Sequence, residues 1–231
     1  MGKLSLNQAQ QEAVDSNQHN ILVLAGAGTG KTRTLVSRVS RLINDNVNPS
    51  SILAVTFTNK ASKEILDRVV TEVGYEGLDV AVGTFHGICN SMVRENADEL
   101  GIDPGYQIID SNEQKKIIKD IIADFRDIIG IDESINIKDS VIINTSIAKI
   151  SRMKEDGITY GEATNPSDVD WDLVEVFRLY EESKKKSSLL DFADLMIMAT
   201  DLLEIDYINH EYHTRWKHLM IDEFQDTNAI Q

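Results

Sequence analysis

Four short apolar runs along the chain have the length of buried β-strands, and segments with helical patterns separate them. The residues in these runs are mostly aliphatic or β-branched, as in strands that are covered on both faces. Strand and helix alternate from residue 21 to about residue 100, which predicts an α/β fold with a parallel sheet. The four runs lie at 21–24, 52–57, 80–84 and 218–223.

Helices are predicted where apolar residues recur every three or four positions. Asn7 is placed to cap the first of them, and Asn59 is placed to cap the helix after the second apolar run. In the first hundred residues the predicted helices cover 6–14, about 31–45, about 60–70 and 85–100.

The pattern changes after Gly101, where longer helical repeats replace the alternation. Ser111 followed by Gln114 has the spacing of a capping box. Apart from a short strand at 107–109, we interpret this part as an all-helical insertion. The α/β pattern resumes after the insertion. The predicted helices cover 111–130, 138–153, 170–186, 189–203 and 207–216. The predicted division is an α/β domain over 1–99 and 187–231, interrupted by a helical insertion over 100–186.

A glycine-rich loop follows the first apolar run and precedes a helical pattern, which is the context of a phosphate-binding loop. Glycines let backbone N–H groups turn towards phosphate oxygens, and a helix N-terminus adds N–H groups and a positive dipole end. Lys31 is placed to reach the β- and γ-phosphates of ATP, and the Thr32 hydroxyl to ligate Mg²⁺. The loop consists of Ala25, Gly26, Ala27, Gly28, Thr29, Gly30, Lys31 and Thr32, with Ala25 where the general pattern has a glycine.

Two acidic residues end the last apolar run, far downstream of the loop. Asp222 is placed to hold Mg²⁺, usually through water, and Glu223 to polarise the water that attacks a phosphate. An acidic pair alone indicates little, but both segments are predicted at the edge of the sheet where open α/β sheets bind ligands. The combination indicates an ATPase.

Charge is distributed unevenly along the chain, whose formal net charge is −15. Residues 1–90 carry no net charge, whereas 91–190 carry −8 and 191–231 carry −7. The negative net charge is weak evidence against nucleic-acid binding, because proteins that bind nucleic acids usually carry a local basic patch. Cys89 is the only cysteine, so we expect it to be a small buried residue in a chain of a reducing, cytoplasmic compartment. The first residues lack the apolar core of a signal peptide, and no apolar run reaches the roughly 18 residues of a membrane span.

The most specific resemblance to a known family lies in the residues Asp222-Glu223-Phe224-Gln225-Asp226-Thr227-Asn228. They resemble the DExQDTN signature of the UvrD/Rep/PcrA-type DNA helicases of superfamily 1A. Upstream, 6–10 resembles the Q motif of that family, and 25–33 resembles its motif I, which commonly begins with alanine. Further matches are 56–61 to motif Ia, 83–86 to motif Ib and 190–195 to the LDFxDL segment, all in family order.

The resemblance implies a RecA-like P-loop NTPase domain with a helical subdomain, called 1B, inserted into it. It also implies an ATP- and Mg²⁺-dependent motor that moves 3′ to 5′ on single-stranded DNA and separates duplex DNA. By this resemblance Gln10 would read the adenine edge and Arg33 would lie near the nucleotide. The family residues that would contact DNA correspond here to Phe57, Thr58, Asn59, Lys60, Thr84 and His86. The residues that would couple the ATP site to the DNA site correspond to Gln225 and Asp226.

The acidic insertion departs from the family, in which 1B is often more basic near the duplex. Its one basic run, Lys184-Lys185-Lys186, is expected to be a solvated helix end rather than a phosphate contact. Asp191 and Asp194 are expected to be charges at a helix N-terminus, with a hinge role as a second interpretation.

The family continues beyond the equivalent of Gln231 with motif III and a second RecA-like domain, which carries arginines that stabilise the transition state. We therefore expect a truncated motor that binds ATP weakly and neither hydrolyses it readily nor unwinds DNA by itself. Three alternatives stay open. A helicase–nuclease of the RecB or AddA kind would contain the same motifs, a phosphate-loop kinase or nucleotide switch would share the loop, and an interaction module would use the acidic insertion.

Overall fold

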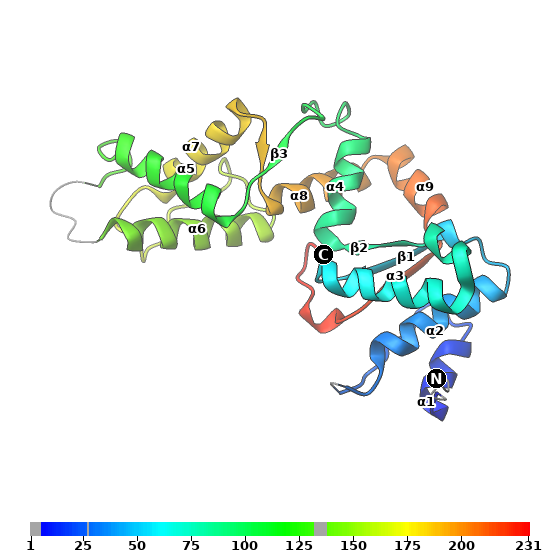
Figure 1. Ribbon diagram of the computed structural model, residues 1–231. Helices are drawn as coiled ribbons and strands as arrows, with labels where there is room; N and C mark the ends of the chain where they lie inside the picture. The colour runs from blue at the N-terminus through cyan, green and yellow to red at the C-terminus, as the bar shows by residue number, and fades with distance from the viewer. Residues whose placement is uncertain (1–5, 27, 132–137) are drawn as a thin grey trace. The chain divides into compact units, whose positions relative to one another are not determined.

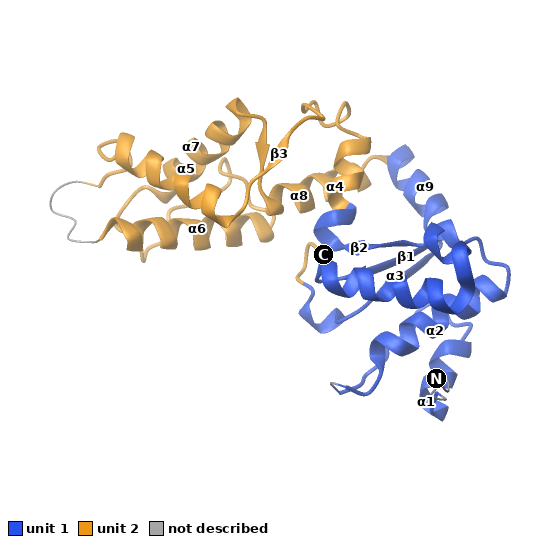
Figure 2. Cartoon of the chain, viewed as in Figure 1, with its two compact units in different colours: residues 1–88, 206–227 blue, residues 89–205, 228–231 orange. Residues whose placement is uncertain are grey.

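The chain forms two compact units, each built from segments that lie far apart in the sequence (Figure 2). The computed structural model describes residues 6–26, 28–131 and 138–231 (Figure 1). Unit 1 comprises Met1–Ile88 and Asp206–Thr227, and unit 2 comprises Cys89–Ile205 and Asn228–Gln231. The domain limits suggested by the sequence, 1–99, 100–186 and 187–231, stay a prediction.

A three-stranded parallel sheet forms the centre of unit 1, with β1 between β2 and β5 (Figure 1). All five residues of β1 (Ile52–Thr56) are buried, which explains why this strand is apolar without alternation. Val55 pairs with Gly83 of β2 (Ala81–Thr84) and with Ile221 of β5 (His218–Ile221). The carboxyl ends of the three strands therefore lie at one edge, as the alternating pattern predicts.

Helices α2 and α3 pack against one another and bury their apolar faces in the core of unit 1. Val36 and Val39 come from α2, Ile65 and Val69 from α3, and all four are almost fully buried with β1. The helices of unit 1 are α1 (Gln8–Asp15), α2 (Lys31–Asn44), α3 (Asn59–Val73), the start of α4 (Phe85–Glu95) and α9 (Asp206–Arg215). Short 3₁₀ turns cover η1 (Pro49–Ser51), η2 (Gly74–Asp79) and η3 (Phe224–Asp226).

Two local expectations for unit 1 are wrong. The apolar run at 21–24 forms no strand, and Leu22 and Leu24 are 69% and 86% exposed. A strand needs a neighbour for its backbone N–H and C=O groups, and among the described residues the sheet of unit 1 pairs only β1, β2 and β5. The cap of α3 is Thr58 rather than Asn59, because the Thr58 hydroxyl accepts a hydrogen bond from the Ala61 N–H at 3.1 Å.

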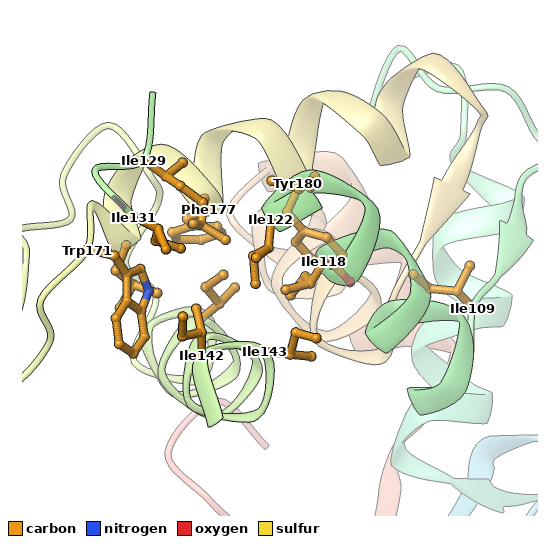
Figure 3. Close-up of a cluster of buried hydrophobic side chains, with 14 residues drawn as sticks. Ile109, Ile118, Ile122, Ile129, Ile131, Ile142, Ile143, Trp171, Phe177 and Tyr180 are labelled. Carbon is orange, nitrogen blue, oxygen red and sulfur yellow. The ribbon is translucent and has the colours of Figure 1, made fainter. Parts of the chain in front are cut away.

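Unit 2 is mostly helical and has its own hydrophobic core (Figure 3). Isoleucines of α5 (Ser111–Asp124) and α6 (Asp139–Glu155) pack against aromatic residues of α7 (Leu173–Lys186). Trp171 precedes α7, is buried in this core, and donates its indole N–H to the Ser146 hydroxyl at 3.1 Å. A buried indole N–H needs such a partner.

The short strand expected at 107–109 is present as β3 (Gln107–Ile108), and it forms a parallel pair with β4 (Leu189–Leu190), which follows the insertion. Residues 189–190, expected to be helical, are therefore a strand, and α8 (Phe192–Leu203) begins after it. The capping box of α5 uses Asp110 and Glu113 instead of Ser111 and Gln114. Helix α4 ends at Glu95, short of the expected residue 100.

No helix in the described ranges is long and apolar enough to cross a membrane.

Candidate functional site

The phosphate-loop residues and the acidic pair meet at the carboxyl edge of the sheet in unit 1. The Lys31 ammonium lies 2.9 Å from a carboxylate oxygen of Glu223, although the two residues are 192 positions apart. The Thr32 hydroxyl donates to the Asp222 carboxylate at 3.2 Å. Helix α2 begins at Lys31 and β5 ends just before Asp222, so two rigid elements hold these four side chains.

The backbone turns sharply directly after β5. The Asp222 N–H still donates to the Val55 carbonyl at 2.9 Å, so Asp222 continues the ladder with β1 and its side chain is buried. Glu223 follows with φ 55° in the left-handed region, which costs about 1–2 kcal/mol for a residue other than glycine. Backbone strain of this kind often occurs at functional sites, where the surrounding structure maintains it.

Gln225 and Lys31 both contact the Glu223 side chain. Gln225 Nε2 donates to Glu223 Oε2 at 2.5 Å, the same oxygen that pairs with Lys31. The Gln225 hydrogen bond, together with Lys31, holds the pKa of Glu223 below its usual range. The carboxylate is therefore ionised at neutral pH and can accept a proton or orient water.

The residues at this edge offer oxygen ligands of the kind that Mg²⁺ prefers. The Thr32 hydroxyl and the Asp222 carboxylate lie side by side, and the ion pair places an ammonium group next to them. Carboxylate and hydroxyl oxygens with room for water are typical of Mg²⁺ sites that also involve phosphates. The donor set therefore fits a magnesium–nucleotide complex.

The glycine-rich loop has the conformation that its sequence requires. Gly28 and Gly30 adopt φ 75° and 91°, in the region that glycine alone enters at little cost. Both the N–H and the hydroxyl of Thr29 donate to the Gly26 carbonyl, at 3.4 and 2.7 Å, which closes a turn. Ala25 is exposed, Arg33 is half-buried on the first turn of α2, and Ala27 lies outside the described residues.

Gln10 is held by hydrogen bonds at both ends of its amide. Oε1 accepts from the Asn7 N–H at 2.9 Å, and Nε2 donates to the Thr29 carbonyl at 2.8 Å. The first contact belongs to the capping box of α1, as expected from Asn7, and the second reaches the phosphate loop.

The residues expected to contact DNA follow two neighbouring strands in unit 1. Thr58, two residues after β1, accepts a hydrogen bond from the Ala61 N–H, and Thr84, the last residue of β2, accepts one from the Gly87 N–H, so each hydroxyl binds the N–H three residues further along the chain. Each hydroxyl still has its own hydrogen to donate, to a phosphate oxygen for example. Burial lowers the pKa of His86, which favours the neutral imidazole. Asn59 and Lys60 are exposed on the first turn of α3.

Phe85 is a residue of this edge that the sequence reasoning did not single out. Its ring lies 5.6 Å from that of Phe57, with the planes tilted by 59°. The available signal was its position, because Phe85 follows β2 as Phe57 follows β1, and β1 and β2 are in register there. Both side chains are half-buried, so each ring has an exposed part.

Of the two residues expected to couple ATP to DNA, only Gln225 contacts the acidic pair through its side chain. Asp226 donates its backbone N–H to the Glu223 carbonyl at 2.9 Å, and its side chain is exposed. Cys89 is half-buried, and burial raises its pKa to about 11, so the thiol is protonated at neutral pH.

Unit 2 contains a buried cluster of charged residues that the sequence reasoning missed. Lys184, expected to be solvated, is 2% exposed, and its ammonium contacts Asp194 at 2.6 Å and Asp191 at 2.9 Å. Lys154 of α6 pairs with the same two carboxylates, and the Tyr180 hydroxyl donates to Asp191 at 2.9 Å. As expected, Asp191 and Asp194 lie at a helix N-terminus, where they form the capping box of α8.

Two lysines in this cluster pair with three carboxylates that could otherwise hold a metal ion. Glu181, Asp191 and Asp194 have oxygens within 4.8 Å of one another. Lys154 and Lys184 each pair with all three of these carboxylates. Burial would raise the pKa of Asp191, but the two ammonium groups outweigh it and hold that pKa well below its usual range.

Comparison with known proteins places the chain among helicase sequences. Residues 6–231 match the model of the UvrD/REP helicase N-terminal domain. DNA helicase II of Escherichia coli K12 is 36% identical over 235 residues, covering 98% of this chain and 31% of that protein. The ATP-dependent DNA helicase PcrA of Staphylococcus epidermidis RP62A is 35% identical over 231 residues, with 98% and 30% covered. The chain thus spans about three tenths of the length of these relatives.

Proposed function

The chain belongs to the UvrD/REP helicase N-terminal domain family, and from this premise we propose that it is the ATP-binding part of a superfamily 1 DNA helicase. The observation that carries the proposal is the meeting of Lys31 and Thr32 with Asp222 and Glu223 at one edge of the sheet. Glycine-rich loop, lysine, hydroxyl and paired acids are together the machinery of a RecA-like P-loop ATPase.

In this proposal the loop and α2 bind the phosphates of ATP. Backbone N–H groups of the loop and the first turn of α2 surround the phosphate oxygens, and the helix dipole favours their negative charge. Lys31 exchanges Glu223 for the β- and γ-phosphates when ATP binds. Thr32 and Asp222 would hold Mg²⁺, which neutralises the charge that develops on the phosphates during transfer.

Glu223 acts on the water that attacks the γ-phosphate. Its depressed pKa keeps it ionised, and release from Lys31 leaves the carboxylate oxygen free to accept a hydrogen bond from that water. Gln225 stays hydrogen-bonded to the same carboxylate and fixes its direction. Through this contact, a movement of η3 would reach the hydrolytic residue, which supports a coupling role for Gln225, with Asp226 beside it.

Single-stranded DNA is proposed to bind along the carboxyl ends of β1 and β2, with movement in the 3′ to 5′ direction. Phe57 offers a ring on which a base can stack, worth about 1–3 kcal/mol per base. The Thr58 and Thr84 hydroxyls, together with Asn59, Lys60 and His86, would contact the phosphate backbone. Gln10 and Arg33 are proposed to lie at the nucleotide, and a second RecA-like domain to complete the ATP site.

Binding of Mg-ATP to this 231-residue chain tests the proposal. Titration calorimetry should detect weak binding that Lys31→Ala reduces at least about tenfold, because a charged hydrogen-bond donor to phosphate is lost. Lys119→Ala, which removes an exposed lysine from α5, is the matched control and should bind as the wild type does. Equal binding by wild type and Lys31→Ala would contradict the proposal. We expect little hydrolysis, with or without single-stranded DNA, and no duplex unwinding by this chain alone.

A further inference from the structure

Gln10 connects helix α1 to the phosphate loop, in addition to any contact with a base. Its Nε2 donates to the Thr29 carbonyl at 2.8 Å, and its Oε1 accepts from the Asn7 N–H at 2.9 Å. These partners fix the orientation of the amide, because the reverse orientation would oppose two donors at Asn7 and two acceptors at Thr29. One N–H and one lone pair of the Gln10 amide remain for other partners.

The opposite end of α1 is anchored to α2. One guanidinium nitrogen of Arg38 donates to the carbonyls of Ala13, Val14 and Ser16 at 2.9–3.1 Å. Arg41 donates to the Val14 carbonyl at 3.2 Å. Two arginines of α2 thus satisfy carbonyl groups at the C-terminus of α1, which have no partner within a helix. Helix α1 is therefore a fixed support for Gln10.

The Gln10 contact determines how one peptide group of the loop is oriented. In a trans peptide the C=O and N–H point in opposite directions. Because the Thr29 carbonyl is directed at Gln10, the Gly30 N–H points away from α1. Gly30 has φ 91°, and a Cβ atom there would lie 2.9 Å from Gln10 Nε2, so the loop passes very close to the glutamine. Only glycine combines this backbone conformation with this approach.

We propose that Gln10 is a positioning residue for the phosphate loop. It holds the Thr29–Gly30 peptide in the orientation that binds phosphate, and it does so whatever base the nucleotide carries. This inference rests on the proposed function of the loop. It differs from adenine reading, the role that the family resemblance implies for Gln10, because it predicts the same loss of affinity for ligands without adenine. The amide donor that holds Thr29 is the group responsible.

Three polyphosphate ligands separate positioning from base reading. Titration calorimetry would compare Mg-ATP, Mg-GTP and magnesium tripolyphosphate on wild type and Gln10→Ala. Positioning predicts that Gln10→Ala weakens all three by the same factor, about three- to tenfold, as expected for one lost hydrogen bond that supports the loop. A loss confined to ATP, with GTP and tripolyphosphate unchanged, would overturn the proposal.

Gln11→Ala is the matched control, because it removes the same side chain one position further along α1. Gln11 Nε2 donates to the exposed Asp15 carboxylate at 2.8 Å. We expect Gln11→Ala to bind all three ligands as wild type does. An equal loss in Gln10→Ala and Gln11→Ala would assign the effect to helix α1 as a whole and would also overturn the proposal.

A ligand-free measurement separates this inference from the proposed function. The ¹⁵N order parameter of the Gly30 amide reports the mobility of the peptide that Gln10 holds. It should fall in Gln10→Ala and in Gln10→Glu and stay unchanged in Gln11→Ala. Gln10→Glu keeps the acceptor for Asn7 but places an oxygen opposite the Thr29 carbonyl. If wild type bound none of the ligands, the proposed function would fail and this measurement would still decide: an unchanged Gly30 order parameter would overturn positioning by Gln10.

Discussion

The Lys184 ammonium lies 2.6 Å from the Asp194 carboxylate, and both side chains are at least nine-tenths buried. The pair belongs to a cluster in unit 2 that also includes Lys154, Glu181 and Asp191. Three elements contribute to it: α6 provides Lys154, α7 provides Glu181 and Lys184, and the start of α8 provides the two aspartates. The cluster therefore connects the three helices through charge rather than through apolar packing alone.

Replacing Lys184 with methionine is expected to destabilise the protein strongly. The variant keeps most of the apolar stem but leaves three carboxylates with the single ammonium of Lys154. Removing one partner of a buried ion pair typically costs about 3–5 kcal/mol, because the remaining charge is buried without compensation. Urea denaturation measures this loss in the free energy of unfolding.

Lys185→Met is the matched control for that measurement. Lys185 is the next residue of the same helix and is exposed, so its loss should change stability by less than about 0.5 kcal/mol. Equal stability of Lys184→Met and Lys185→Met would contradict the buried position of Lys184.

The same cluster makes stability fall at acidic pH. The Lys154 and Lys184 ammonium groups hold the pKa of Asp191 below its unfolded value of about 3.9. A carboxyl group of this kind contributes stability that is present above its unfolded pKa and is lost as pH falls towards its folded pKa. Burial would lower the pKa of Lys154, but the nearby carboxylates outweigh it and raise that pKa, so the stability that Lys154 contributes persists until pH exceeds the unfolded lysine value of about 10.4.

Unfolding free energies between pH 3 and pH 7 test this dependence with Asp191→Asn. The variant should be less stable than wild type at pH 7, and the difference should shrink as pH falls below about 4. Asp120→Asn, at an exposed position of α5, should follow the wild-type curve. A constant difference between Asp191→Asn and wild type across this range would contradict the assignment.

Sequence alone located the residues of the candidate ATP site but not those of the charge cluster. Lys31 and Asp222 could be placed together because each adjoins a predicted element whose end faces the carboxyl edge of a parallel sheet. Their chemical roles stay a prediction. Helical spacing puts Lys184, four residues after Tyr180, on the apolar face of α7, but both lysines continue one basic run at a helix end, where charged side chains are usually solvated. Which of them is buried depends on where α6 and α8 pack, and that is tertiary information.

Element boundaries were the other limit. Thr58 and Asn59 are both good capping residues, so the sequence could not tell which one precedes α3. The run at 21–24 has the composition of a strand, but composition does not show whether a neighbouring strand is present to pair with it. Periodicity thus predicted which elements exist in the core of unit 1 more reliably than it predicted where each one starts.

The cap of α3 gives a direct test of one corrected boundary. Thr58→Ala removes the hydroxyl that accepts the Ala61 N–H and should lower the free energy of unfolding by about 1 kcal/mol. Asn59→Ala, at the first position inside the helix, should change stability much less. Thermal or urea denaturation of both variants measures the effect. A larger loss for Asn59→Ala would restore Asn59 as the cap.

The ion pair between Lys31 and Glu223 should compete with ATP. Glu223→Gln removes the negative charge that holds the Lys31 ammonium but keeps an oxygen for Gln225. Because both side chains are partly exposed, solvent screens the pair and it is weak, so Mg-ATP should bind only about two- to fivefold more tightly to the variant. Titration calorimetry measures the change. Glu72→Gln, an exposed residue of α3, makes the same change in net charge and should leave the affinity unaltered. Weaker binding to Glu223→Gln would mean that Glu223 directs Lys31 towards phosphate instead of competing for it.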